Sequence, residues 1–127
     1  MKELIDNMLS RKVWAVVGAT DNQSKFGYKI YKKLKSRGYE VYPVNPVYDQ
    51  VDGDKCYSKV SDIPKKVDCV DVVVSPKRSM MVIDDCVEAE VEYMWFQPHT
   101  FDLEVLAKAK SEDIKIVYNN CVLVQLG

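Results

Sequence analysis

A polar loop near the start of the chain holds the first residues that could do chemistry. The apolar run "VWAVVGA" (13–19) ends in a glycine turn, and "TDNQSK" (20–25) connects this turn to a helical pattern. Such a turn presents free backbone N–H groups and the positive end of a helix dipole, and both attract phosphate. The candidate contacts are Gly18, Ala19, Thr20, Ser24, Lys25 and Phe26. In an alternative interpretation, Gly18 only allows the tight turn and Ser24 caps the helix.

The loop differs from the fingerprint of a nicotinamide dinucleotide site. That fingerprint reads G-x-G-x-x-G and places an acidic residue at the end of the second strand. Here no glycine stands two residues after Gly18, and Asn45 occupies the acidic position. NADP would favour a basic residue near that point, and none lies between Val41 and Gln50. An NAD(P)-dependent oxidoreductase is therefore kept only as an alternative function.

Alternating strand and helix patterns must position this loop. Apolar, β-branched runs predict five strands, at 13–19, 39–46, 67–76, 92–98 and 114–120. Amphipathic spacing predicts helices at 4–9, 28–37, 78–90 and 102–110. We expect an α/β protein with a three-layer, doubly wound, Rossmann-like parallel sheet of about five strands, in the order 3-2-1-4-5. Ligands bind beyond the carboxyl ends of such strands, so the loops of interest are 18–27, 44–48, 75–79, 96–101 and 119–121.

Length, charge and cysteine content restrict the class of protein. The 127 residues suit a single domain over 1–127, and a net charge of -1 gives a nucleic acid no general attraction. No apolar run approaches the roughly 20 residues that span a bilayer, and "MKELIDNMLSRK" lacks a signal-peptide pattern. The cysteines, at 56, 69, 86 and 121, fit neither a CxxC zinc spacing nor a dense disulfide framework. We expect reduced thiols in a cytoplasmic protein, with Cys69 and Cys86 in the core.

Three segments resemble the small coenzyme A-binding protein family. They are "VVGATDNQSKFGYKIYKKLKSRGYEVYPVNP" (16–46), "DIPKKVDCVDVVVSP" (62–76) and "YMWFQP" (93–98). The likeness covers almost the whole chain, and the "PVNP" turn is its most specific element. The chain departs from the family at "QPHT" (97–100), where a glycine is common, and at "NNCV" (119–122), where Asp-Arg-Cys-Pro is usual. The N-terminal domain of the succinyl-CoA synthetase alpha subunit has the same fold.

The resemblance implies that the chain binds coenzyme A or an acyl-CoA. In the related synthetase domain the turns after the first, second and fourth strands contact the ligand. The implied contacts here are Thr20–Lys25, Asn45, Pro46 and Phe96–Pro98, including Gln97. The loop after the third strand adds Ser75, Pro76, Lys77 and Arg78, and its two cations could reach the adenine end or the 3′-phosphate. In the alternative interpretation, these cations are solvated charges at the start of a helix.

The sequence gives little support to catalysis. His99 is the only histidine and has no placed partner, and Cys121 would need an exposed thiol of low pKa to form a mixed disulfide with the ligand. Metal-ligand spacing and a G-K-[ST] phosphate loop are both missing. We therefore expect a non-catalytic binding or regulatory protein that associates with neither nucleic acid nor membrane. An accessory subunit of an acyl-CoA synthetase with a vacant site is an alternative, and a protein partner or homo-oligomer stays open.

Overall fold

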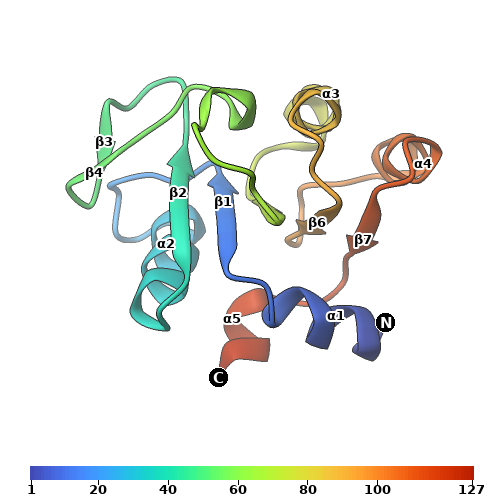
Figure 1. Cartoon of the computed structure of the whole chain (residues 1–127), viewed down its shortest axis with the longest axis horizontal. Coiled ribbons are helices and arrows are strands. Elements are labelled where there is room, and N and C mark those ends of the chain that lie inside the picture. The colour runs from blue at the N-terminus through green and yellow to red at the C-terminus, as the bar shows by residue number, and fades with distance from the viewer.

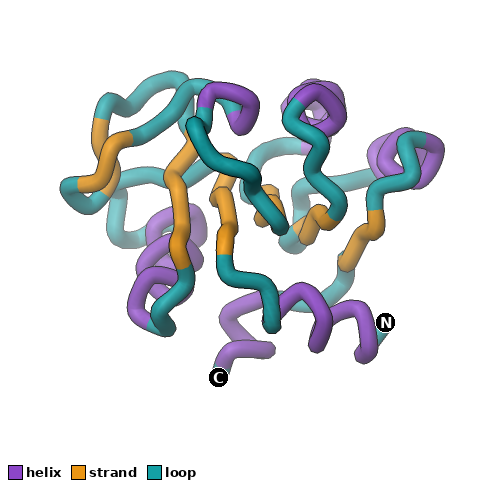
Figure 2. The backbone as a smooth tube through the Cα atoms, viewed as in Figure 1, coloured by secondary structure: helices purple, strands orange, loops and turns teal.

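A five-stranded parallel sheet forms the centre of the molecule in a computed structural model that describes all 127 residues (Figure 1). Its strands are β1 (Val13–Val17), β2 (Glu40–Val44), β5 (Cys69–Val72), β6 (Tyr93–Phe96) and β7 (Lys115–Val117). The helices are α1 (Lys2–Leu9), α2 (Phe26–Ser36), α3 (Pro76–Glu88), α4 (Leu103–Ser111) and α5 (Val122–Leu126). The predicted fold class is confirmed, because helices cover both faces of a parallel sheet (Figure 2).

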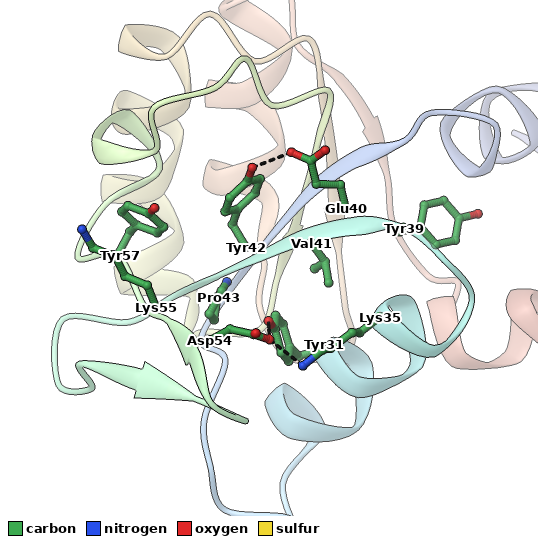
Figure 3. A pocket seen from close by; sticks show the side chains of 10 residues that line it. All are labelled: Tyr31, Lys35, Tyr39, Glu40, Val41, Tyr42, Pro43, Asp54, Lys55 and Tyr57. Carbon is green, nitrogen blue, oxygen red and sulfur yellow. Dashed lines mark hydrogen bonds and ion pairs between the residues drawn. The ribbon is translucent and has the colours of Figure 1, made fainter.

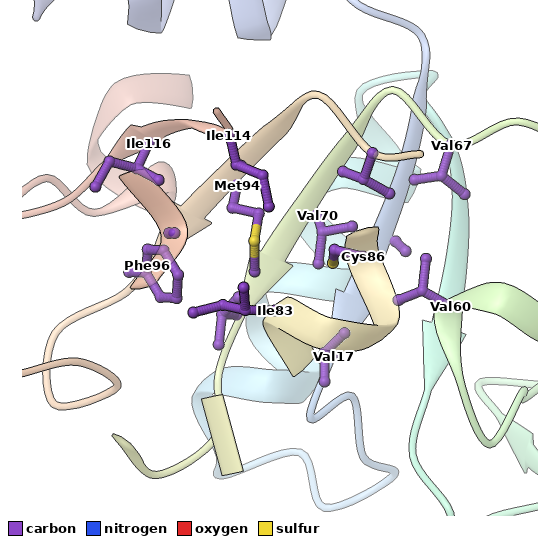
Figure 4. Packing of buried hydrophobic residues seen from close by; sticks show 14 of the residues in the cluster. Val17, Val60, Val67, Val70, Ile83, Cys86, Met94, Phe96, Ile114 and Ile116 are labelled. Carbon is purple, nitrogen blue, oxygen red and sulfur yellow. The ribbon is translucent and has the colours of Figure 1, made fainter. Parts of the chain in front are cut away.

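Two apolar layers hold the sheet between its helices. On the α3 side, residues such as Ile83, Met94 and Phe96 pack together between the sheet and α3 and α4 (Figure 4). On the α2 side, Trp14 and Trp95 pack with residues of α1, α2 and α5. Cys69 and Cys86 are fully buried, as expected, and this burial raises the pKa of both thiols.

The predicted strand order 3-2-1-4-5 is wrong. The sheet runs β2-β1-β5-β6-β7, so the third strand of the central sheet pairs with β1 instead of β2. Pro43 gives the physical reason, because it lies on the side of β2 that faces away from β1 and has no N–H to donate to a further strand. Pro43 O accepts from Tyr57 N and Asn45 N donates to Tyr57 O, which is the only pairing beyond this edge. By contrast, all four residues of β5 are buried, as an interior strand requires.

Two segments take structure that the sequence pattern did not predict. The turn-rich segment after β2 contains an antiparallel hairpin, β3 (Gln50–Val51) with β4 (Asp54–Lys55), and a 3-10 turn, η1 (Val60–Asp62). The apolar end of the chain forms α5, which lies beside α1 (Figure 1). Each helix of the molecule is too short or too polar to cross a membrane.

Candidate functional site

The candidate site lies where the strand order reverses, between β1 and β5. From β1 the chain crosses through α2 to β2 at one edge, whereas from β5 it proceeds through α3 and α4 toward the other edge. Two crossovers that leave in opposite directions open a crevice at the carboxyl ends of the two strands. With the observed strand order, the loop after β1 still lies at this crevice. The loop after β5 lies next to it, because β5 is adjacent to β1.

Gly18 brings these two loops into direct contact. Its φ of +99° is a conformation that favours glycine, and a Cβ at this position would lie 2.6 Å from Val73 O. Gly18 N also donates to Val44 O at the end of β2, at 2.9 Å. The turn therefore joins the ends of three adjacent strands. The phosphate-loop interpretation and its alternative both placed a tight turn at Gly18.

Gly27 shapes the candidate site, and the sequence analysis did not include it among the site residues. It lies in the first turn of α2, where an added Cβ would stand 2.1 Å from Gly18 O. Absence of a side chain lets the helix begin directly against the turn, as the third glycine does in dinucleotide-binding folds. A glycine inside a predicted first helical turn was the available signal, because that position otherwise favours a better helix former.

The loop between the two glycines presents free amides toward solvent. Lys25 is the N-cap of α2 and makes no side-chain cap bond, so the alternative that Ser24 caps this helix is wrong. Tyr28 N and Lys29 N donate to Lys25 O, whereas the exposed Asp21, Gln23 and Phe26 have amides without an acceptor in the chain. Such amides at a helix N-terminus favour an anion. The phosphate role of the loop stays a prediction.

The two hydroxyl groups of the loop serve the fold in this structure. Thr20 is buried, and its Oγ1 lies 2.7 Å from the Tyr48 hydroxyl while accepting from Asn22 N at 3.1 Å. Ser24 Oγ donates to Asn22 Oδ1 at 2.6 Å. Asn22 therefore organises the loop, a role that its local hydrogen bonding suits. Of the side chains expected to donate to a phosphate, Lys25 is left exposed and unpaired.

The segment after β2 holds the loop from one side. Asn45 Nδ2 donates to Ala19 O at 2.9 Å, and its Oδ1 accepts from Val47 N at 3.0 Å. Ala19 is fully buried, so its side chain packs in the core beneath the loop surface. Pro46 is exposed next to Asn45. In this structure the "PVNP" turn therefore holds the loop after β1 in place through the hydrogen bond from Asn45 to Ala19.

A second helix N-terminus faces the crevice from the β5 side. Ser75 is the N-cap of α3, Pro76 is its first residue, and Ser75 makes no side-chain cap bond. Lys77 and Arg78 follow in the first turn, exposed and without an ion pair. Because the loops before α2 and α3 touch through Gly18, the two positive helix ends and these cations share one region. Whether the cations bind a ligand stays a prediction.

The loop after β6 is fixed by its own hydrogen bonds. Gln97 is buried, and its side chain contacts the equally buried Asp71 of β5 at 2.9 and 3.0 Å. Thr100 N and Oγ1 both donate to Gln97 O, which leaves Pro98 and His99 exposed at the tip of the turn. His99 has a φ of +71°, as expected at the third residue of a type II turn. Gln97 therefore points into the protein, away from the surface where a ligand contact was expected.

The loop after β7 adds few exposed groups. Asn120 O accepts from Trp95 Nε1 at 2.7 Å, so this backbone carbonyl provides the hydrogen-bond partner of a buried indole N–H. Cys121 is half-buried at the start of α5. Trp95 and Phe96 are fully buried, which excludes them as contact surfaces in this conformation.

A separate cleft of about 310 Å³ lies at the outer edge of β2 (Figure 3). Its acids are already paired within the chain: Asp54 with Lys35 and Tyr31, and Glu40 with Lys65. The Glu40 carboxylate also accepts from the Tyr42 hydroxyl, and this bond raises the pKa of Tyr42 to about 12. We retain the crevice between β1 and β5 as the candidate site, because its amides and cations lack partners.

Comparison with known proteins identifies the family. Residues 12–127 match the family model described as CoA binding domain. The chain belongs to this CoA-binding domain family. A hypothetical protein from Pyrococcus horikoshii has the same fold, with a TM-score of 0.94 and 37% identity over 98% of this chain and 89% of that one.

Relatives of the CoA-binding domain occur in two contexts. An ADP-forming acetate–CoA ligase of Methanocaldococcus jannaschii is 32% identical over 85% of this chain, which spans only 16% of the ligase. The uncharacterized protein YneT of Bacillus subtilis is 26% identical, over 98% of this chain and 90% of its own length. A domain of this kind is thus found both inside long ligases and in a chain of similar size.

Proposed function

We propose that this CoA-binding domain binds coenzyme A or an acyl-CoA in the crevice between the β1–α2 and β5–α3 loops. Membership of the family supports the ligand class. The observation that supports this location most is the contact of Gly18 with Val73 O, which sets two uncapped helix N-termini side by side. A pyrophosphate and a 3′-phosphate need several donors and cations, which the free loop amides, Lys25, Lys77 and Arg78 supply.

We further propose a carrier or regulatory role without catalysis by this chain alone. The exposed His99 makes no hydrogen bond and no ion pair that would position it as an acid or base. The match to YneT over nearly its whole length supports a role as a separate chain. The ligase relatives support a second possibility, in which the domain works with an acyl-CoA ligase partner.

Calorimetric titration with coenzyme A tests this function. Saturable heat release with coenzyme A, and a flat fluorescence titration with NADH, are the expected results. Binding of NADH without binding of coenzyme A would contradict the proposal and favour an oxidoreductase. If neither ligand binds and affinity capture returns one acyl-CoA ligase, the chain works as an accessory subunit instead.

Replacement of both Lys77 and Arg78 by alanine tests which part of the ligand these cations contact. If they bind the 3′-phosphate, the variant should lose about tenfold or more in affinity for coenzyme A, because a charge-assisted contact contributes more than 1 kcal/mol. Affinity for dephospho-CoA, which lacks this phosphate, should change little. The matched control replaces Lys12 and Lys110, two exposed lysines that make no ion pair and lie outside the loops of the proposed site. Equal losses for both ligands would remove the 3′-phosphate role.

A further inference from the structure

Asp71 is a carboxylic acid in the middle of an apolar layer. It belongs to β5, where Val70 and Val72 pack on the α3 side while Cys69 packs on the α2 side. Alternation along the strand therefore directs Asp71 to the α2 side. The residue is fully buried, and Asp71 is the only Asp, Glu, Lys, Arg or His among the buried residues.

The carboxyl group of Asp71 has one partner, the side-chain amide of Gln97. Gln97 Nε2 lies 2.9 Å from one carboxyl oxygen and 3.0 Å from the other. No cation approaches, and a buried carboxylate without a cation is costly. Burial accordingly raises the pKa of Asp71 well above its ordinary value, and the bond from Gln97 opposes this shift only in part.

Gln97 connects this acid to three segments around the candidate site. Its Oε1 accepts from Val122 N, the first amide of α5, at 3.4 Å. Its backbone O accepts from the Thr100 hydroxyl at 2.6 Å, and Thr100 O accepts from Ser79 Oγ in the first turn of α3, also at 2.6 Å. The side-chain amide of Gln97 therefore joins β5 to α5, while its backbone carbonyl and Thr100 connect the turn after β6 to the first turn of α3.

We propose that Asp71 and Gln97 form an uncharged buried pair that positions the strand-end loops and α5, and that ionisation of Asp71 loosens them. Gln97 Nε2 supplies a hydrogen-bond donor but no opposite charge, so it offsets only part of the cost of burying an ionised carboxylate. An ionised Asp71 would draw water or a cation into the layer, which requires α5 or the turn after β6 to open. Asp71 is thus a positioning residue that acts through Gln97.

The surroundings leave Asp71 as the only buried carboxyl group in this layer. The other titratable side chains packed there are phenols and thiols: Tyr31, Tyr39, Tyr48, Tyr93, Cys56 and Cys69. Cys121 precedes α5, and Arg11 stacks over the outer side of Tyr93 at 5.0 Å. Burial raises the pKa of the Cys69 thiol and of Tyr31, so neither competes with Asp71.

The direction of the pH dependence follows from the raised pKa of Asp71. The folded state holds the proton more tightly than the unfolded state, so its contribution to stability is complete below the ordinary pKa of 3.8. That contribution falls as the pH rises toward the folded-state pKa, by up to tenfold in the folding constant for each pH unit. Asp52 and Glu40 act oppositely and at lower pH, because lysine partners lower the pKa of each.

Asp71→Asn removes the ionisation while keeping the shape of the side chain and one carbonyl acceptor for Gln97 Nε2. Denaturant unfolding of wild type and variant between pH 5 and pH 8 gives the ratio of their folding constants at each pH. We expect this ratio to move in favour of the variant by up to tenfold per pH unit. A ratio that stays constant across this range would overturn the proposal.

Amide hydrogen exchange of the wild-type protein tests the positioning role without any variant. The Val122 amide bonds to Gln97 Oε1, whereas the Leu106 amide of α4 bonds to Asp102 O. Protection of Val122 should fall relative to that of Leu106 as the pH rises from 6 to 9. A constant ratio of the two protection factors would contradict the coupling, even if Asp71→Asn fails to fold.

The effect on the ligand rests on the proposed function. Calorimetric titration with coenzyme A should show the wild type losing affinity relative to Asp71→Asn as the pH rises. Equal pH profiles for the two proteins would show that the pair does not position the site. If coenzyme A fails to bind at every pH, the proposed function fails, while unfolding and exchange still decide the role of the buried pair.

Discussion

At the scale of single residues, the candidate site depends on two glycines that let backbone approach backbone. Gly27 should be the more revealing of the two to replace, because alanine normally stabilises a helix interior by about 1 kcal/mol. Here the added Cβ would stand 2.1 Å from Gly18 O, so α2 must move away from the turn. Gly27→Ala should therefore destabilise the protein by about 2–3 kcal/mol, as measured by urea unfolding.

Gly38→Ala is the matched control for this prediction. Unlike Gly27, Gly38 has a positive φ, +87°, but a Cβ added to Gly38 would meet no atom within 4 Å. We expect its replacement to cost only the conformational strain, about 1 kcal/mol. A Gly27→Ala variant as stable as wild type, or more stable, would show that the close approach of α2 is unimportant.

At this scale the sequence predicted the backbone of the loop after β1 better than the contacts of its side chains. The glycine turn and the helix after it could be predicted, because both depend on neighbouring residues. Partners distant in the sequence could not: Thr20 bonds to Tyr48, Asn45 to Ala19, and Gln97 to Asp71. Asp71 left one signal, since it interrupts an otherwise apolar strand pattern in "VDCVDVVV".

At the scale of elements, the β3–β4 hairpin is held against α2 by ion pairs. Asp52 accepts from Lys32 at 2.9 Å and from Lys35 at 3.0 Å, and these bonds lower the pKa of Asp52. A lowered pKa means stability that is present above the ordinary value of 3.8 and is lost as the pH falls through the folded-state pKa. The hairpin should therefore loosen in acid, below about pH 4.

Asp52→Asn tests this dependence. Exposed pairs contribute little, so we expect a loss of up to about 1 kcal/mol at pH 7 that disappears near pH 2, as measured by thermal unfolding. Asp6→Asn is the control, because its pair with Lys2 is highly exposed and should contribute less still. An Asp52→Asn effect that is the same at pH 2 and pH 7 would contradict the ion-pair account.

The error in strand order also belongs to this scale. Alternating strands and helices predicted the layers correctly, because each amphipathic face needs a sheet face to cover it. Two strand orders satisfy the same handedness rule, and they differ in whether the second or the third strand lies at the edge. Pro43 in "EVYPV" could have decided between them, since an interior strand requires the N–H that proline lacks.

At the scale of the whole molecule, this CoA-binding domain presents three unpaired cations and several free amides at one end of the sheet. Lys77 and Arg78 stand at the start of α3, and Lys25 stands at the start of α2. The acidic residues Asp52, Asp54 and Glu40 around the β2 edge are instead paired with lysines. With a net charge of -1, the molecule has local rather than general attraction for anions.

The most direct test of the account is an amide NMR titration with coenzyme A, which reports the location of binding residue by residue. The account predicts saturable shifts for the amides of Gly18 to Phe26 and of Ser75 to Arg78, with little change at Val41 and Tyr57 beside the β2-edge cleft. Shifts confined to the β2 edge, or none at saturating ligand, would contradict binding between the β1–α2 and β5–α3 loops.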